Sequence, residues 1–119
     1  MTRIFVVDAF AEAPFTGNPA AVVPDAAGLS DAVMQNIAAE MNLSETAFLT
    51  EAEGALRLRW FSPVHEVAFC GHATIATAHV LTAELGRAGP CLFETQVGPL
   101  RVETDGGSLV LEVPRLDPE

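Results

Sequence analysis

The segment from Ala73 to Leu85 constrains the fold most, because its residues are apolar on almost every face of a helix. A helix with that pattern is buried all round. Several of its residues are small, which lets strands approach closely: Ala73, Ala76, Ala78 and Ala83. Because a sheet and a helix bury their apolar faces on each other, we predict a curved sheet wrapped about this central helix.

The rest of the chain predicts mainly strands, at residues 3–10, 20–23, 45–50, 55–61, 91–96, 100–104 and 108–113. In the clearest of them, Leu56, Leu58 and Trp60 occupy every second position, which is the period of a half-buried strand. Helices and strands are thus mixed along the chain, and the expected fold class is α+β.

Helix and turn signals separate these strands. A second helix is predicted from Asp31 to Met41, with Ser30 as its N-cap. The dipeptide Gly98-Pro99 and the sequence Asp105-Gly106-Gly107 are predicted to divide the last three strands by turns. With 119 residues, the chain is long enough for one domain and too short for two ordinary ones.

The charge balance excludes some classes of partner. Six Lys and Arg against sixteen Asp and Glu give a net charge of −10, which repels nucleic acid and anionic membrane surfaces. The longest weakly polar stretch is too short to span a bilayer. Cys70 and Cys91 lack metal-ligand spacing and are typical of reduced thiols. We therefore expect a cytoplasmic protein without nucleic-acid or membrane partners.

The sequence Cys70-Gly71-His72 stands directly before the predicted central helix. The free N–H groups of a first helical turn favour a carboxylate or a carbanionic oxygen, and Gly71 lets a ligand approach the backbone. The alternative is a tight turn with His72 as the N-terminal cap. Cys70 is either a thiolate favoured by the helix start or, more commonly, an inert buried thiol.

Glu45 stands at the mouth of an apolar strand, where desolvation favours the protonated carboxyl group that a proton shuttle needs. The alternative is an ordinary exposed glutamate. No nucleotide-binding motif occurs in the sequence. His72 and His79 lie two helical turns apart, too far to share a metal ion. The expectation is a site with no cofactor and no metal.

Taken in order, these segments resemble the phenazine-biosynthesis isomerase (PhzF-like) family, a branch of the diaminopimelate-epimerase fold. The resemblance lies in five stretches: Val7–Phe10, Phe15–Val23, Ile37–Phe48, Arg59–Pro63 and Glu66–Thr74. It implies a protein of two similar halves, each a curved, mostly antiparallel sheet around a buried central helix. The active site of the family lies in the cleft between the two halves.

The resemblance also implies a chemistry without metal or organic cofactor, in which one carboxylate removes a proton and returns it elsewhere on the molecule. Glu45 matches the catalytic glutamate of the family. Five more positions match residues that cradle the substrate or line the cleft: Asn18, Ser44, Cys70, Gly71 and His72. In the epimerase relatives, a cysteine at the position of Cys70 transfers the proton. The substrate is expected to be a small anionic molecule, a carboxylate.

Family members are longer than this chain, so residues 1–119 are expected to form a single domain equivalent to the N-terminal half, with the second half absent. Three arrangements are open: a homodimer that imitates the two halves, a pairing with a separate chain carrying the C-terminal half, or a degenerate remnant. Association is favoured, because a lone half exposes the apolar face built for its partner.

Three functions follow from these alternatives. The leading one is isomerase or epimerase-type proton transfer on a small carboxylate, in an active site that a second subunit completes, with Glu45 as acid and base. The rival is a non-catalytic ligand-binding or interaction module of the same fold, a half-domain remnant. The third is an epimerase centred on Cys70 instead of Glu45.

Overall fold

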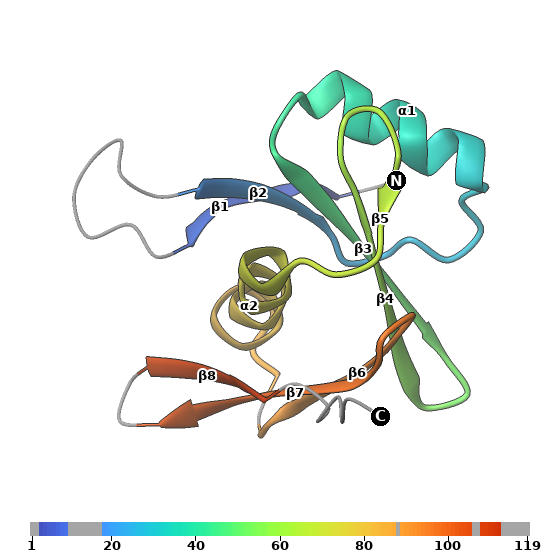
Figure 1. Ribbon diagram of the computed structural model, residues 1–119. Helices are drawn as coiled ribbons and strands as arrows, with labels where there is room; N and C mark the ends of the chain where they lie inside the picture. Colours follow the sequence, from blue (N-terminus) through green and yellow to red (C-terminus); the bar gives the residue numbers. More distant parts are fainter. Residues whose placement is uncertain (1–2, 10–17, 88, 106–107, 113–119) are drawn as a thin grey trace, which may run out of the picture.

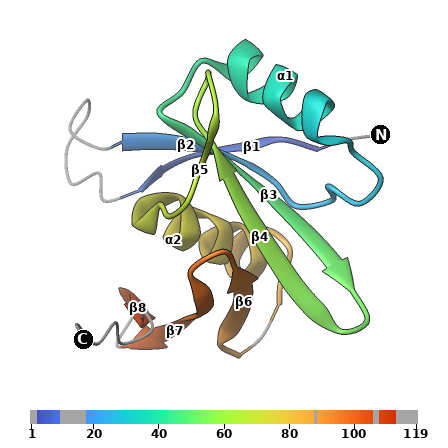
Figure 2. The same ribbon diagram turned by 45° about the vertical axis from the view of Figure 1, so that its right-hand side comes forward.

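A computed structural model describes residues 3–9, 18–87, 89–105 and 108–112 of the chain. In it, one sheet curls around the helix α2 (Gly71–His79), while the helix α1 (Asp31–Met41) lies outside the curl (Figures 1 and 2). This arrangement confirms the predicted α+β class and the curved sheet around a central helix. No helix in the described ranges is both long and apolar enough to cross a membrane.

Within the described residues the sheet has eight strands, and neighbouring strands run antiparallel in most pairs. Their order is β1-β2-β3-β4-β6-β7-β8, with β5 paired to the end of β4. The pairs β2–β3 and β4–β6 are parallel. The strands are β1 (Phe5–Ala9), β2 (Asn18–Val23), β3 (Glu45–Ala52), β4 (Ala55–Phe61), β5 (Glu66–Val67), β6 (Cys91–Thr95), β7 (Gly98–Asp105) and β8 (Ser108–Glu112).

The central helix α2 begins at Gly71, two residues before the predicted start, and continues into a π-helical turn, η1 (Val80–Glu84). Its small residues Ala73, Ala76 and Ala78 are buried against the sheet. The hydroxyl groups of two buried threonines donate 2.8 Å hydrogen bonds to carbonyls one turn back, from Thr74 to Cys70 and from Thr77 to Ala73. Polar side chains can therefore lie in this core, because their donors are satisfied.

The apolar sequence of this helix predicts burial on all sides, and this prediction is wrong. His79 and Ala83 are exposed, and burial ends near Leu81. The buried face is the one that packs on β1, β2, β3 and β8. The reason is geometric: the sheet forms a half-open curl, which covers some faces of the helix and leaves others uncovered (Figure 2).

The alternation along β4 separates two apolar layers. Leu56, Leu58 and Trp60 belong to the inner core with α2. Phe61 points to the opposite face, where it packs edge-on against Phe48 at 5.3 Å beneath α1. The outer layer is small. The predicted N-cap of α1 is confirmed, because Ser30 Oγ accepts a hydrogen bond from the Val33 N–H at 3.2 Å. The sheet therefore packs apolar side chains on both of its faces.

Two turn predictions have different outcomes. Gly98-Pro99 is not a turn but the start of β7, where Pro99 stands opposite Glu94. The turn lies at residues 96 and 97, immediately before Gly98. Thr95 Oγ1 closes it by donating a hydrogen bond to the Gly98 carbonyl at 2.7 Å. β7 and β8 pair antiparallel as the Asp105-Gly106-Gly107 signal predicts. Residues 106 and 107 themselves lie outside the described ranges.

Candidate functional site

Glu45 is the first residue of β3. Ala47 and Leu49, at every second position after it, belong to the inner core around α2. The two-residue period of a strand places Glu45 on that same inner face. The strand therefore delivers the carboxyl group to the end of α2, and the Glu45 side chain remains 21% exposed there.

Three of the predicted residues meet at the first turn of α2, and we call them the Glu45 cluster: Glu45, Cys70 and His72. The Cys70 thiol donates a hydrogen bond of 3.3 Å to Glu45 Oε1, although 25 residues separate the two in sequence. His72 Nε2 lies 3.2 Å from the same oxygen. Cys70 Sγ is also 3.5 Å from His72 Nδ1. A carboxylate, a thiol and an imidazole are thus in mutual contact.

Burial decides the protonation state of Cys70. Desolvation, aided by the negative charge of Glu45, raises the pKa of the Cys70 thiol to about 12, although the backbone N–H groups of Ala73 and His72 act against the shift. The thiol therefore stays protonated at neutral pH and acts as a hydrogen-bond donor. Of the two alternatives for Cys70, the geometry favours the buried thiol over the thiolate.

Gly71 forms part of the first turn without a backbone geometry that requires glycine. A Cβ atom added there would lie 3.6 Å from Leu111 Cδ2 and 3.7 Å from Phe69 Cζ, which are ordinary contact distances. The fold of the described residues thus accepts a side chain at position 71. Packing does not explain the glycine.

Ser44 and Asn18 lie at the same end of the sheet as Glu45. Ser44 directly precedes Glu45 and is exposed. Asn18 is the first residue of β2, and two residues later Ala20 stands opposite Glu45 in the parallel β2–β3 register. The side chain of Asn18 lies outside the described part of the structure. Both residues are near the cluster by topology, and their role in a site stays a prediction.

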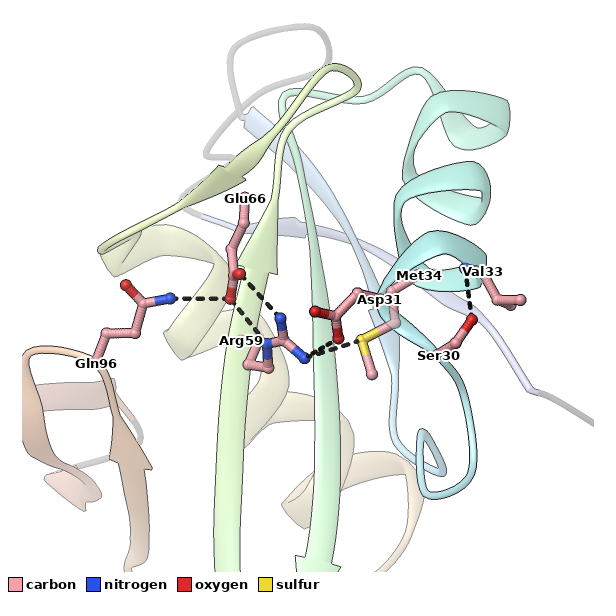
Figure 3. A network of polar contacts seen from close by, with 7 residues as sticks. All are labelled: Ser30, Asp31, Val33, Met34, Arg59, Glu66 and Gln96. Carbon is pink, nitrogen blue, oxygen red and sulfur yellow. Dashed lines mark hydrogen bonds and ion pairs between the residues drawn. The ribbon is translucent and has the colours of Figure 1, made fainter.

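A second polar cluster, which the sequence analysis did not identify, occupies the outer face of the sheet (Figure 3). We call it the Arg59 cluster: Asp31, Arg59, Glu66 and Gln96. Arg59 donates from Nε and Nη2 to the two carboxylate oxygens of Glu66, at 2.8 and 2.9 Å, and from Nη1 to Asp31 Oδ1 at 2.9 Å. Gln96 Nε2 adds a 3.0 Å hydrogen bond to Glu66. The period of β4 predicts that Arg59 points outward, but it does not predict these partners.

The charges of the Arg59 cluster stabilise one another. Hydrogen bonds from Arg59 lower the pKa values of Glu66 and Asp31, and the two carboxylates raise the pKa of Arg59 further. Glu66 stands on β5, four residues before Cys70. The ion pairs therefore fasten the strand that leads into the Glu45 cluster.

Comparison with known proteins identifies the family. The model of the phenazine biosynthesis-like protein family, PhzC–PhzF, matches residues 7–115. A protein of Pseudomonas aeruginosa called an uncharacterized isomerase is 55% identical over 117 residues, which are 98% of this chain and 45% of that protein. The crystal structure of a PhzF-family protein from Enterococcus faecalis superposes with a TM-score of 0.82 and 49% identity, over 89% of this chain and 42% of that one.

A more distant structure shows the breadth of the fold. A hydroxyproline epimerase from Agrobacterium vitis, crystallised with trans-4-hydroxy-L-proline, has a TM-score of 0.64 at 12% identity, over 92% of this chain and 40% of its own length. At that identity, only the fold is shared. The chain spans less than half the length of each of these proteins. The family model covers nearly all of the sequence, and the curled sheet of this chain superposes on a solved member of the family. The chain therefore belongs to the phenazine biosynthesis-like (PhzC–PhzF) family.

Proposed function

We propose that this chain forms one wall of a cofactor-independent isomerase or epimerase active site, in which Glu45 moves a proton on a small carboxylate-containing metabolite. The names of the relatives support this reaction class, since the Pseudomonas protein is called an isomerase. A general acid–base group contributes about 10²–10⁴-fold to a proton transfer. Glu45 is the residue to which we assign that contribution.

The single observation that carries the proposal is the kind of neighbours that Glu45 has. It contacts a thiol and an imidazole, at 3.3 and 3.2 Å. The chain contains no lysine. Each arginine in the described part pairs with a carboxylate other than that of Glu45. A permanent cation would hold the carboxylate ionised and weaken it as a base. Within the described residues no arginine lies beside Glu45, as its proposed role as acid and base requires.

The first turn of α2 supplies the anion site in this proposal. The earliest backbone hydrogen bond at this end runs from the Thr74 N–H to the Cys70 carbonyl, at 3.1 Å. The N–H groups before Thr74 therefore lack carbonyl partners within the helix, and the helix dipole favours an anion beside them. A substrate carboxylate bound by Gly71 and His72 would place its neighbouring C–H bond near Glu45. We assign Asn18 and Ser44 to the lining of the same cleft.

Cys70 acts in this scheme as a donor to Glu45 and not as the base. Its buried thiol is protonated, and its hydrogen bond orients the carboxylate. A Cys70→Ser variant keeps a donor of similar shape, so we expect it to retain proton exchange within about tenfold. Complete loss of exchange in this variant, with the fold intact, would favour the Cys70-centred epimerase.

A second subunit completes the site in our proposal, because the relatives are more than twice as long as the matched region. The opposite wall comes from another copy of the chain or from a chain carrying the C-terminal half. Light scattering distinguishes these cases: a dimer of the purified chain supports the first. A monomer that gains activity when a C-terminal half is added supports the second.

The test of the chemistry is solvent-deuterium uptake, measured by NMR in D2O on a panel of small carboxylates with an acidic C–H bond. We expect Glu45→Gln to slow the uptake by about 10²–10⁴-fold while leaving the fold unchanged. Glu66→Gln removes a carboxylate of the other cluster and serves as the matched control. Equal rates in the two variants would disprove the role of Glu45. Carboxylate binding without exchange, in the assembled protein, would favour the non-catalytic module.

A further inference from the structure

The Glu45 cluster combines three side chains of different chemistry that are all metal ligands. Glu45, Cys70 and His72 each direct a ligand atom to one place, with these atoms within 4.8 Å of one another. The spacing of His72 and His79 along a helix predicts that these two residues do not share a metal ion. His79 is exposed farther along the helix. The partners that tertiary structure gives to His72 are a carboxylate from β3 and the thiol two residues before it.

The triangle formed by the ligand atoms has the size of one face of a zinc tetrahedron. Bonds of about 2.3 Å to sulfur and about 2.0–2.2 Å to nitrogen and oxygen separate tetrahedral ligand atoms by about 3.3–3.6 Å. The Sγ–Oε1 and Nε2–Oε1 edges are 3.3 and 3.2 Å. The Sγ–Nε2 edge is 3.9 Å, long by a few tenths of an ångström, which a small rotation of the imidazole ring corrects.

The charge of the cluster also suits a divalent cation. A zinc ion bound by the Glu45 carboxylate and a Cys70 thiolate is neutralised, and the imidazole of His72 adds a third ligand without charge. No arginine of the described ranges competes for Glu45. The side chains of His72 and Glu45 are 18% and 21% exposed, so water can reach the fourth position. A thiolate ligand selects zinc over magnesium or calcium.

We propose that Glu45, Cys70 and His72 form a zinc-binding site in which zinc acts as a reversible inhibitor. Binding forms bonds from zinc to Oε1, Nε2 and Sγ, and the thiol proton of Cys70 passes to solvent. Water occupies the fourth position. The inhibition rests on the proposed function, because zinc engages the carboxylate that moves the proton. The binding of zinc does not depend on it.

The experiment uses the 119-residue chain without a histidine tag, freed of metal by a chelator. Co²⁺ is titrated first, because a cobalt–thiolate bond gives a near-ultraviolet charge-transfer band and tetrahedral cobalt gives strong visible bands. We expect both signals to saturate at one ion per chain and to vanish when Zn²⁺ displaces cobalt. A cobalt complex without the thiolate band, or no saturable binding of either ion, overturns the proposal. This measurement needs no variant.

Variants then identify the ligands through competition with a zinc indicator. We expect Cys70→Ser and His72→Gln each to weaken zinc binding by at least about tenfold. Cys91→Ser is the matched control, because Cys91 is also buried but belongs to β6 and has no partner in the Glu45 cluster. Unchanged affinity in the Cys70 variant, or a loss in the Cys91 variant as large as that in the Cys70 variant, overturns the assignment.

Inhibition is measured separately from binding. In the deuterium-uptake assay, one equivalent of zinc should stop exchange, and a chelator should restore it. Zinc bound at Cys70 without any effect on exchange overturns the inhibitory role, whereas the proposed function is decided separately by the comparison of Glu45→Gln with Glu66→Gln. A saturating cobalt–thiolate signal in a protein that exchanges no substrate proton supports the zinc site and counts against the proposed function.

Discussion

The two polar clusters occupy opposite faces of the same sheet, and they solve the problem of holding carboxylates in different ways. On the outer face, the Arg59 guanidinium joins Asp31 and Glu66 through charge-assisted hydrogen bonds (Figure 3). On the inner face, Glu45 contacts the neutral thiol of Cys70 and the imidazole of His72. In the first cluster one guanidinium is shared by two carboxylates, whereas in the second no arginine of the described residues lies beside the carboxylate.

From this difference we predict that the Arg59 cluster supports the fold and that the Glu45 cluster carries the proposed chemistry. Bidentate contacts between Arg59 and Glu66 fasten β5 to β4, and the hydrogen bond from Gln96 connects them to the β6–β7 turn. Such contacts stabilise a structure and restrict change. The Glu45 cluster holds its carboxylate near donors but without a permanent cation. Variants that give one cluster the character of the other therefore test the distinction.

The largest effect is expected when the Glu45 cluster receives the guanidinium that the outer cluster has. His72→Arg places a permanent positive charge beside Glu45, which favours the ionised carboxylate and makes it a weaker base. We expect deuterium uptake to fall at least about 10²-fold below that of His72→Gln, the neutral control. Comparable uptake rates in these two variants would show that the absence of a cation beside Glu45 has no functional meaning.

The next effect concerns stability and belongs to the Arg59 cluster. Arg59→Met leaves two carboxylates without their partner, and we expect the free energy of unfolding in urea to fall by about 1–3 kcal/mol, between the values for exposed and buried ion pairs. Arg57→Met is the control on the same strand, because the Arg57 side chain is 66% exposed and pairs with Glu94 at 3.7 Å. It should change stability by less than about 0.5 kcal/mol. Equal losses would contradict the distinction between the two arginines.

The same cluster makes stability depend on pH. Hydrogen bonds from Arg59 lower the pKa of Glu66 below its ordinary value of 4.5. A lowered pKa in the folded state means that this stabilisation is complete above the unfolded pKa and is lost as the pH falls through the folded pKa. We expect the unfolding free energy to decline below about pH 4.5, and less steeply in Arg59→Met than in the unmodified protein. Parallel pH profiles for the two proteins would argue against the ion pair as the cause.

The smallest effect is expected at Gly71, beside the Glu45 cluster. Because a Cβ atom there meets Leu111 and Phe69 at ordinary distances, Gly71→Ala should fold normally and gain up to about 1 kcal/mol through a less flexible unfolded chain. Thermal unfolding measures this gain. A loss of stability would mean that packing requires the glycine, and the first turn of α2 would then belong with the structural cluster.

Much of the fold follows from the sequence, because it depends on periodic patterns. The alternation in β4 determines its two faces, and the small apolar residues of α2 determine that a sheet must curl around it. The predicted limits of α1 and β4 are confirmed. The two-residue strand β5 is too short to produce a pattern, and Gly98-Pro99 carries a turn signal that the pairing of β6 with β7 overrides.

The features of the candidate site also fall into those that the sequence predicts and those that only the tertiary structure decides. The residue types at Glu45, Cys70, Gly71 and His72, and their order among recognisable segments, are properties of the sequence, and they indicated the family and the kind of chemistry. Which groups touch is decided by tertiary structure alone, because contacts across 25 residues, such as that of Cys70 with Glu45, depend on strand register and on the position of α2 in the curl. The tertiary structure likewise pairs Arg59 with Glu66 on the outer face of the sheet, opposite to the face that carries Glu45.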